Sequence, residues 1–176
     1  FGDGTMYLER FINNPRHIEV QVIGDSHGNA IHIGERDCSL QRRHQKVIEE
    51  SPAILLNDET RAKLHEVAVK ATKYLKYEGA GTFEFLADDK QNIFFMEMNT
   101  RLQVEHPVSE MVSGIDIVEL MIKVAEGEKV PPQEAIKFRG HAIECRITAE
   151  DPNSFLPSPG KVTQWMVPGG RNVRVD

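Results

Sequence analysis

Hydrophobic and polar residues alternate most clearly between Phe94 and His106. The even positions from 94 to 104 hold Phe, Met, Met, Thr, Leu and Val, and the odd positions from 97 hold Glu, Asn, Arg, Gln and Glu. Because successive side chains of an extended chain point to opposite faces, this segment predicts a strand with one mostly apolar face. The other face would carry acids, amides and a guanidinium, which are suited to binding metal ions or oxyanions. An edge strand with a solvated face is the alternative interpretation.

Shorter segments with the same period predict further strands. The strongest is 17–23, with Ile18, Val20 and Val22 on one face. The others span residues 6–12, 30–34, 46–49, 80–87, 141–148 and 161–167. Turn-forming residues at 25–29 and 88–92 predict two hairpins, and the second of them places Glu84 near Glu97.

A helix is predicted after Asn57 or Asp58, either of which can cap its first turn. It runs to about Tyr77, and Gly79 is the expected left-handed residue that ends it. Its predicted buried stripe consists of Leu64, Val67, Ala68, Ala71 and Leu75.

A second helix is predicted from Asp116 to about Ala125, with Glu119 completing its cap. Residues 107–111 predict one helical turn, and 128–134, with two prolines, predict a connector. Together with the hairpins, these elements predict an α+β fold in which the helices pack on one side of an antiparallel sheet.

Composition and charge narrow the class of protein. The chain has 176 residues, 40% hydrophobic and 27% charged, as expected for a globular protein. Its net charge of −6 disfavours general nucleic-acid binding, and no apolar run is long enough to predict a membrane span. Cys38 and Cys145 lack metal-type spacing, so we expect reduced core thiols and a cytoplasmic location. The chain begins with Phe1, so we expect it to be a fragment of a longer protein.

The most specific chemical pattern joins Glu84, Glu97 and Asn99 on adjacent predicted strands. Two carboxylates and an amide carbonyl form an all-oxygen set, which suits Mg²⁺ or Mn²⁺ bound together with phosphate oxygens. The alternative for Glu84, which lies between two Phe residues, is an ion pair with a Lys or Arg.

Arg101, Gln103 and Glu105 follow on the same predicted face. The guanidinium of Arg101 can hold a planar oxyanion through paired hydrogen bonds, and Glu105 can act as a general base. An arginine–glutamate pair within a structural network is the alternative. Arg146 alternates with apolar neighbours, so it either pairs with Glu144, Glu150 or Asp151 or reaches a ligand.

The polar stretch from Glu35 to Glu50 has no clear period, and we interpret it as a structured loop leading into the short strand at 46–49. Its residues 41–46 read Gln-Arg-Arg-His-Gln-Lys. They form either a solvated basic loop or a phosphate-facing loop with Gln41 and His44 or Lys46 turned inward.

These motifs taken together resemble the biotin carboxylases of the ATP-grasp superfamily. The most specific are Phe-Met-Glu-Met-Asn-Thr-Arg at 95–101 and Gln-Val-Glu-His-Pro-Val at 103–108. Matching segments follow the family's order at 14–17, 35–39, 42–46, 79–85, 140–146 and 155–161. The resemblance covers essentially the whole chain, and it is strongest to the biotin carboxylase subunit of bacterial acetyl-CoA carboxylase.

The resemblance implies a ligase that uses ATP to form carboxyphosphate from bicarbonate and then carboxylates biotin on a carrier protein. Glu84, Glu97 and Asn99 would hold Mg²⁺ or Mn²⁺. Bicarbonate would be held by Lys46, Arg101, Gln103 and Val104. The catalytic residues would be Lys46, Arg101, Glu105 as the base and Arg146 at the biotin ureido oxygen. ATP would be bound by Glu9, Arg10, Ile12, His17, Gln41, His44, Glu84, Leu86 and Glu97.

The resemblance also implies a division of the chain. Residues 1–12 would end the ATP-grasp lid and include the adenine hinge, 13–130 would form the ATP-grasp core subdomain, and 131–176 would begin the C-terminal domain. Because the family's glycine-rich lid loop is missing, we expect little or no turnover from this fragment alone. The implied partners are the biotin carboxyl carrier protein, carboxyltransferase subunits and a second copy in a homodimer.

The alternatives differ in substrate or class. The same module occurs in propionyl-CoA, methylcrotonyl-CoA and pyruvate carboxylases, which the sequence barely separates from acetyl-CoA carboxylase. The 103–106 motif and Arg146 argue against another ATP-grasp ligase acting on a carboxylate. A non-catalytic scaffold is the alternative of a third class, and substituting Glu97 or Arg101 in the parent protein would distinguish it, because a scaffold would be indifferent to the change.

Overall fold

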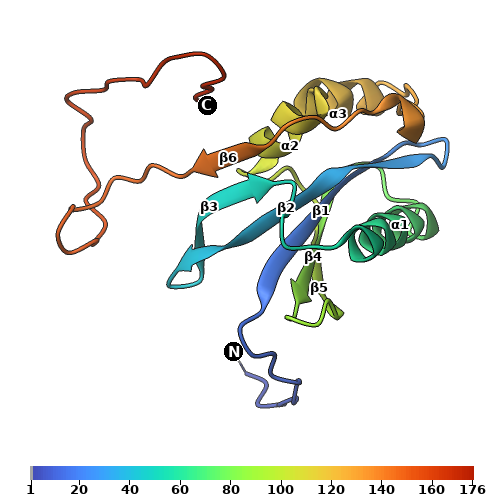
Figure 1. Ribbon diagram of the computed structural model, residues 1–176, viewed down its shortest axis with the longest axis horizontal. Coiled ribbons are helices and arrows are strands. Elements are labelled where there is room, and N and C mark those ends of the chain that lie inside the picture. The colour runs from blue at the N-terminus through green and yellow to red at the C-terminus, as the bar shows by residue number, and fades with distance from the viewer. Residues whose placement is uncertain (1) are drawn as a thin grey trace. The chain divides into compact units, whose positions relative to one another are not determined.

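A six-stranded antiparallel sheet organises the part of the chain up to Arg146. The computed structural model describes residues 2–176, which form two units, one ending at Arg146 and the other spanning Ile147–Asp176. The strands are β1 (Arg16–Gly24), β2 (Ala30–Arg42), β3 (Gln45–Ser51), β4 (Gly79–Ala87), β5 (Ile93–Asn99) and β6 (Ala142–Cys145). Their order in the sheet is β5-β4-β1-β2-β3-β6, so β1 and β4 lie in its interior (Figure 1).

Helices cover both faces of the sheet, which corrects the expectation that they pack on one side. They are α1 (Asp58–Tyr74), α2 (His106–Ser113) and α3 (Ile117–Ala125), with a short 3-10 turn at Gln133–Ala135. Figure 1 shows α1 on one side of the strands and α2 and α3 on the other. In the described part of the chain, none of these helices has the length and apolar character that crossing a membrane requires.

The alternation in β1 explains why both faces are covered. Ile18, Val20 and Val22 join the apolar cluster that includes Leu64 and Ala68 of α1. The next residue on the opposite face, Ile23, belongs to a second cluster with Ile117 and Leu120 of α3. Glu19 and Gln21 alternate with these aliphatic residues along β1, and both are fully buried on the same face as Ile23. A sheet buried on both sides thus carries polar groups inside, and these must be paired.

The polar stretch after Gly34 is a strand rather than a loop. β2 continues to Arg42, and its residues Glu35, Arg36 and Asp37 are each at most 3% exposed. Sequence periodicity fails here because charged residues occupy interior positions, where their hydrogen-bond partners come from distant strands and helices. The short strand predicted at 46–49 is confirmed within β3.

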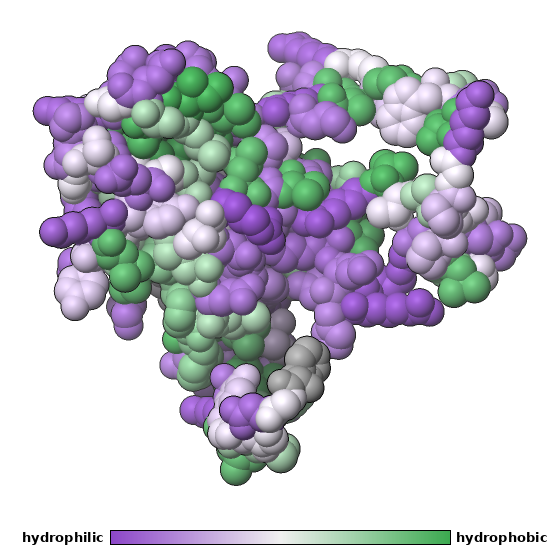
Figure 2. Space-filling view, turned by 180° about the vertical axis from the view of Figure 1, so that it is seen from behind, coloured by the Kyte–Doolittle hydropathy of each residue, from purple (hydrophilic) through white to green (hydrophobic). Residues whose placement is uncertain are grey.

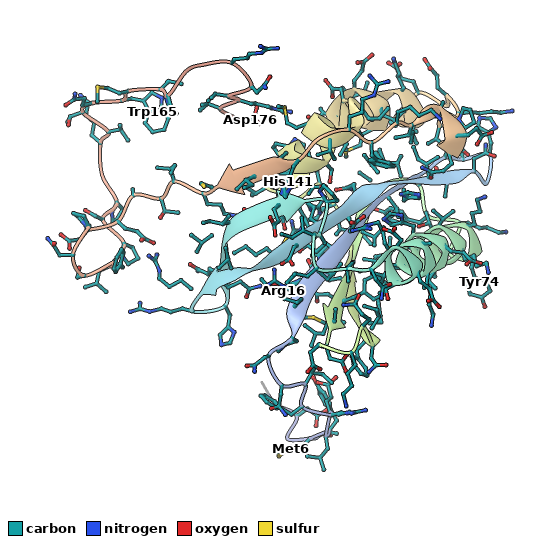
Figure 3. All side chains as sticks on the ribbon, viewed as in Figure 1. Met6, Arg16, Tyr74, His141, Trp165 and Asp176 are labelled. Atoms are coloured by element: carbon teal, nitrogen blue, oxygen red, sulfur yellow. The ribbon has the colours of Figure 1, made fainter. Side chains whose placement is uncertain are left out.

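Four other predicted strands are wrong or too long. Residues 6–12 and 161–167 form no strand, and the long alternation from Phe94 ends as a strand at Asn99. A strand needs a pairing partner, and the structure assigns none to 6–12, whose Met6 and Leu8 are 89% and 100% exposed. Figure 2 shows that apolar groups are exposed on one face of the molecule, and Figure 3 shows the side chains of Met6 in the N-terminal segment and Tyr74 at the end of α1. The strand at 141–148 is shortened to β6.

The predicted capping of α1 is confirmed at its start but not at its end. The Asn57 side chain accepts a hydrogen bond from the backbone N–H of Thr60. The helix ends at Tyr74, and Lys76 (φ 49°) adopts the left-handed conformation there, whereas Gly79 begins β4.

The buried stripe of α1 is also partly different from the prediction. Val67 and Leu75 are 45% and 57% exposed, while Thr60 and Thr72 are buried. Thr72 is accommodated because its hydroxyl donates to the carbonyl of Ala68. The cap of α3 is as predicted, since Asp116 accepts from the backbone of Glu119.

A polar cluster lies between β2 and α1, away from the predicted site residues. Glu35 accepts hydrogen bonds from Arg61 Nε at 2.8 Å and contacts His65 Nε2 at 2.7 Å. Burial opposes the charge of Glu35, but these partners outweigh it and lower its pKa to about 2. The His32 ring stacks on that of His65 at 3.9 Å, and burial, together with His65, lowers the pKa of His32 to about 4.

This cluster predicts that stability decreases on acidification. Below its ordinary value of 6.5, His32 takes a proton in the unfolded chain, but it takes one in the folded chain only near pH 4. Glu35 extends the loss from about 4.5 down to about 2. We expect the free energy of unfolding to fall by on the order of 2 kcal/mol between pH 7 and pH 4 from His32. Urea unfolding of the parent and of His32→Asn at several pH values would measure this. If the free energy of unfolding fell equally with pH in the two proteins between pH 7 and pH 4, the prediction would be contradicted.

Candidate active site

The candidate site lies on the sheet face that α2 covers, at the centre of β1 and β4. Glu84 of β4 is directly opposite Glu19 of β1 and Glu97 of β5 in the strand register. The side chains of Glu19 and Glu84 are 0% and 5% exposed. Three carboxylates thus meet along one row of the sheet, and cations must balance those that are buried.

Lys46 of β3 supplies one of these cations. Its ammonium donates to Glu84 Oε1 at 3.1 Å, to Glu105 Oε1 at 2.7 Å and to Glu19 Oε1. Burial would lower the pKa of Lys46, but the surrounding carboxylates outweigh burial and raise it. Lys46 therefore stays charged and connects residues from β1, β4 and the start of α2.

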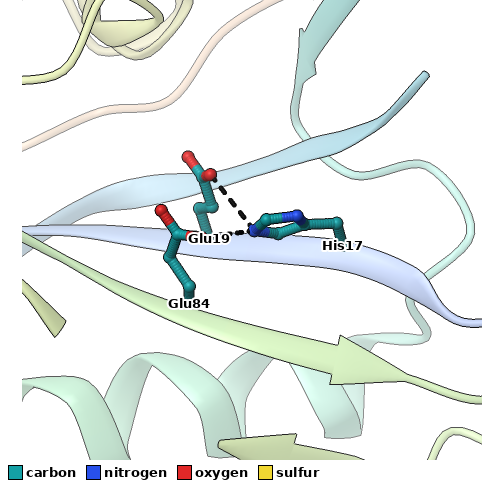
Figure 4. A group of neighbouring side chains, drawn as sticks. All are labelled: His17, Glu19 and Glu84. Atoms are coloured by element: carbon teal, nitrogen blue, oxygen red, sulfur yellow. Dashed lines mark hydrogen bonds and ion pairs between the residues drawn. The ribbon is translucent and has the colours of Figure 1, made fainter. Parts of the chain in front are cut away.

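Glu84 is held by donors from several elements. His17 Nε2 lies 2.6 Å from Glu84 Oε2 and 3.4 Å from Glu19 Oε1 (Figure 4). Gln103 and Asn99 donate their amide N–H groups to Glu84 Oε1 at 2.7 and 2.9 Å. Burial opposes the charge, yet His17, Lys46 and Gln103 lower the pKa of Glu84 to about 2. The sequence left an ion pair with a Lys or Arg as the alternative to metal binding by Glu84, and the structure contains such a pair between Glu84 and Lys46.

The predicted metal ligands are joined through one amide group. Asn99 Nδ2 lies 3.2 Å from Glu97 Oε1 and 2.9 Å from Glu84 Oε1, and Arg101 Nη2 lies 3.3 Å from Asn99 Oδ1. Turning the Asn99 amide would present its oxygen beside the two carboxylates, and oxygen donors of this kind suit Mg²⁺. The donor set therefore fits the predicted ion. His17, Glu19 and Glu84 form a second close group, with one donor atom of each within 4.8 Å of the others.

Arg146 lies just beyond β6 and faces two carboxylates. Its Nε donates to Glu49 Oε1 at 2.6 Å, and its Nη2 donates to Glu105 Oε2 at 2.8 Å. Of the partners considered from the sequence, Glu144 forms no ion pair with it in the described residues. The carboxylate of Glu105 therefore lies between Lys46 and Arg146. Burial would raise its pKa, but the hydrogen bond and charge of Lys46 and the charge of Arg36 outweigh burial and lower the pKa, which keeps Glu105 ionised.

Other predicted residues lie at the margin of this cluster. Gln41 donates to His17 Nδ1 at 2.9 Å, and Leu86 is half-buried on β4. The His44 side chain is exposed in the β2–β3 turn, where its backbone is left-handed (φ 62°). Val104 is 60% exposed, so the apolar face predicted for its segment is not formed there. Three residues predicted to bind ATP lie in the N-terminal segment, namely Glu9, Arg10 and Ile12. The guanidinium carbon of Arg10 lies 5.6 Å from the ring centre of Phe94.

Three charged residues of the cluster were not predicted, namely Glu19, Arg36 and Glu49. Arg36 is fully buried and donates to Glu19, Gln21, Ser109, Thr82 and Gln103 at 2.7 to 3.2 Å. A usable signal was present at Glu19, because a carboxylate alternates with aliphatic residues in the strongest predicted strand. Arg36 gave no such signal, since it lies in the stretch interpreted as loop.

The two cysteines differ in burial. Cys38 is buried, as predicted, and burial raises the pKa of its thiol. Cys145 is exposed, so its placement in the core is wrong. The reason is that β6 is the edge strand of the described sheet, where alternate side chains lack a covering layer.

Comparisons with known proteins identify the family of the chain. A family model described as the ATP binding domain of the carbamoyl-phosphate synthase L chain matches residues 1–133, and one described as the biotin carboxylase C-terminal domain matches 144–176. The chain is 58% identical over 177 residues to a biotin carboxylase of Pseudomonas aeruginosa. It is 57% identical over 170 residues to the methylcrotonoyl-CoA carboxylase subunit alpha of Mus musculus.

Solved structures give the same result. The crystal structure of the biotin carboxylase from Campylobacter jejuni superposes with a TM-score of 0.94 at 72% identity, and the match covers 99% of this chain and 39% of that one. The Pseudomonas match likewise covers 100% of this chain and 39% of the relative. The chain thus spans well under half the length of these relatives. The family models, the identities and the fold agree that the chain belongs to the biotin carboxylase family of ATP-grasp proteins.

Proposed function

We propose that the protein carrying this chain uses ATP and bicarbonate to carboxylate biotin on a carrier protein by way of carboxyphosphate. The observation that supports this most is the meeting of Lys46, Glu84, Glu105 and Arg146 in one buried, hydrogen-bonded cluster. A cluster of alternating cations and carboxylates can hold an anionic substrate and move a proton from it. The domain division predicted from the sequence, with a boundary after residue 130, stays part of this proposal.

The nucleotide and its metal would bind at the Glu97 end of the cluster. Glu84, Glu97 and Asn99 would hold Mg²⁺ or Mn²⁺, which when bound neutralises phosphate oxygens for phosphoryl transfer. The adenosine and phosphate groups would contact a set that spans the N-terminal segment and β1, β2, β4 and β5, namely Glu9, Arg10, Ile12, His17, Gln41, His44, Glu84, Leu86 and Glu97. Among these, His17 is already oriented by Gln41 and Glu84.

Bicarbonate would bind where Lys46, Arg101, Gln103 and the backbone N–H of Val104 provide donors. The buried Glu105 would take its proton, since its carboxylate is ionised and lies within a hydrogen bond of Lys46. Arg146 would stabilise the negative charge that develops on the biotin ureido oxygen. The two cations beside Glu105 thus serve the two halves of the reaction.

The partners and the acyl acceptor are also proposals. The relatives include a 2-oxoglutarate carboxylase small subunit as well as the methylcrotonoyl-CoA carboxylase subunit, so the site is shared by enzymes with different acceptors. We favour the biotin carboxylase of an acetyl-CoA carboxylase in fatty acid synthesis, located in the cytoplasm. It would act with a biotin carboxyl carrier protein and carboxyltransferase subunits. The solved biotin carboxylase domain of the Hydrogenobacter thermophilus enzyme is described as a dimer, and we propose a homodimer here too.

A biotin-dependent ATPase measurement tests the proposal. The complete protein is expected to cleave ATP in a reaction that needs bicarbonate and is stimulated by free biotin. The 176-residue chain alone is expected to show little or no turnover. ATP cleavage by the complete protein that ignores bicarbonate would contradict the function, and near-normal turnover by the chain alone would contradict the expectation for the fragment.

A further inference from the structure

Two glutamates outside the proposed substrate contacts lie opposite each other on adjacent strands. Glu49 of β3 is directly opposite Glu144 of β6 in the strand register. Side chains at opposed positions of antiparallel strands start about 5 Å apart at their Cβ atoms. Glu49 is fully buried. The Oε2 atoms of both residues are buried and have no hydrogen-bond partner among the described residues.

Two ionised carboxylates are not a stable arrangement at this position. Like charges directly opposite each other repel, and a buried carboxylate oxygen without a donor bears the cost of lost hydration. One proton removes both costs, because a protonated carboxyl becomes an O–H donor for the neighbouring oxygen. The two oxygens that lack partners are thus the two that such a hydrogen bond would join.

The ion pair with Arg146 determines which glutamate keeps its charge. Arg146 Nε donates to Glu49 Oε1 at 2.6 Å, while Glu144 has no ion pair in the part of the chain that the structure describes. The cation therefore favours ionised Glu49, which leaves the proton to Glu144. In agreement, burial and the charge of Glu49 raise the pKa of Glu144 to about 7. Burial also raises the pKa of Glu49, but Arg146 opposes this.

We propose that Glu49 and Glu144 share one proton and act together as positioning residues for Arg146. Glu144 donates its O–H to Glu49 Oε2, and Glu49 Oε1 then holds Arg146 Nε. With Nη2 engaged by Glu105, the N–H groups of Arg146 Nη1 remain without a partner within the described residues and are available to a substrate oxyanion. This last consequence rests on the proposed function, whereas the shared proton does not.

The surroundings of the pair come from several elements. The charged groups that influence it are Arg146 after β6, Glu105 before α2, Arg36 of β2 and Glu19 of β1. Arg146 bonds to both Glu49 and Glu105, so a change in the charge of the pair is transmitted to the proposed catalytic base. Raising the pH through the titration of Glu144 would place a second negative charge beside Glu49 and disturb the position of Arg146.

Carboxyl-carbon NMR on the chain labelled at glutamate tests the shared proton directly. The Glu144 signal is expected to titrate with a midpoint near 7. In Glu49→Gln the midpoint is expected to fall toward the ordinary range of a glutamate, because the opposing charge is gone. Glu50→Gln is the matched control, since Glu50 is the next residue of β3 and pairs with His141, and it should leave the midpoint unchanged. A Glu144 midpoint at an ordinary glutamate value, or one that does not move in Glu49→Gln, overturns the proposal.

The positioning role has its own measurement. In the parent chain the Arg146 Nε–H signal is expected to shift with the same midpoint as Glu144. In Glu144→Gln, whose amide can donate to Glu49 at every pH, that shift should disappear while the low-pH position is kept. A pH-dependent shift that persists unchanged in Glu144→Gln overturns the role of Glu144, and this variant stays informative if Glu49→Gln does not fold. In the complete protein, we expect the rate of biotin carboxylation to decline above neutral pH as Arg146 is disturbed. This decline should be absent in Glu144→Gln.

Discussion

Replacing Arg36 with methionine is expected to destabilise the chain by about 3 to 5 kcal/mol. The guanidinium is fully buried and donates to Glu19 through Nε and Nη2, at 3.2 and 3.0 Å. It also donates to Gln21 at 2.7 Å and to Gln103 at 2.9 Å. Methionine fills part of the volume but leaves the carboxylate of Glu19 with Lys46 as its remaining close cation. The loss therefore comes from a buried carboxylate that no longer has the guanidinium as a partner and from several acceptors left without donors.

Urea unfolding of the parent and the variant measures this effect. Lys70→Met is the control, because Lys70 and its partner Glu66 are 73% and 62% exposed on one helix face. Such a surface pair is worth about 0.3 to 0.5 kcal/mol. If Arg36→Met and Lys70→Met cost the same, the buried network does not have the importance for stability that we assign to it.

Replacing Glu105 with glutamine in the complete protein is expected to lower the bicarbonate-dependent rate by about 10² to 10⁴-fold. The substitution keeps the shape of the side chain but removes the carboxylate that would accept the proton of bicarbonate. It also places an amide N–H near Lys46 or Arg146, which lie 2.7 and 2.8 Å from the two carboxylate oxygens. Nucleotide affinity should change little, because the nucleotide contacts are assigned to other residues.

Steady-state rates at saturating ATP and bicarbonate check this prediction, and Glu126→Gln on the exposed end of α3 provides the control. An unaltered rate in Glu105→Gln would remove Glu105 from the reaction. A lost rate together with lost nucleotide binding would instead indicate that the whole cluster had collapsed. The two outcomes separate a chemical role from a structural one.

Much of the candidate site followed from short-range sequence patterns. The hairpin that places Glu84 opposite Glu97 was predicted from the turn residues at 88–92, and the register confirms it. Asn57 and Asp116 were identified as N-caps because a side-chain oxygen can reach an N–H three residues ahead. Such features involve neighbours within a few positions, so the sequence alone contains the information.

The errors occurred where distant partners decide the structure. Residues 35–42 look like a loop because they are charged, and they form a strand because Arg36 finds Glu19, Ser109 and Gln103 in the fold. Residues 6–12 look like a strand, and the described structure provides no strand to pair with them. Arg101 and Gln103 were placed on one strand face, and instead the chain leaves the sheet after Asn99, with Gln103 turned inward to Glu84.

The sequence by itself determined the family, the α+β character and the hairpin carrying Glu84 and Glu97, because local periodicity and specific motifs are enough for these. Only the tertiary structure showed that helices cover both faces and that Glu19, Arg36 and Glu49 belong to the cluster. It also showed that Arg146 pairs with Glu49 and Glu105. The physical reason is that a buried charge is tolerated only beside its partners, and those partners are brought together by strand order and register rather than by proximity along the chain.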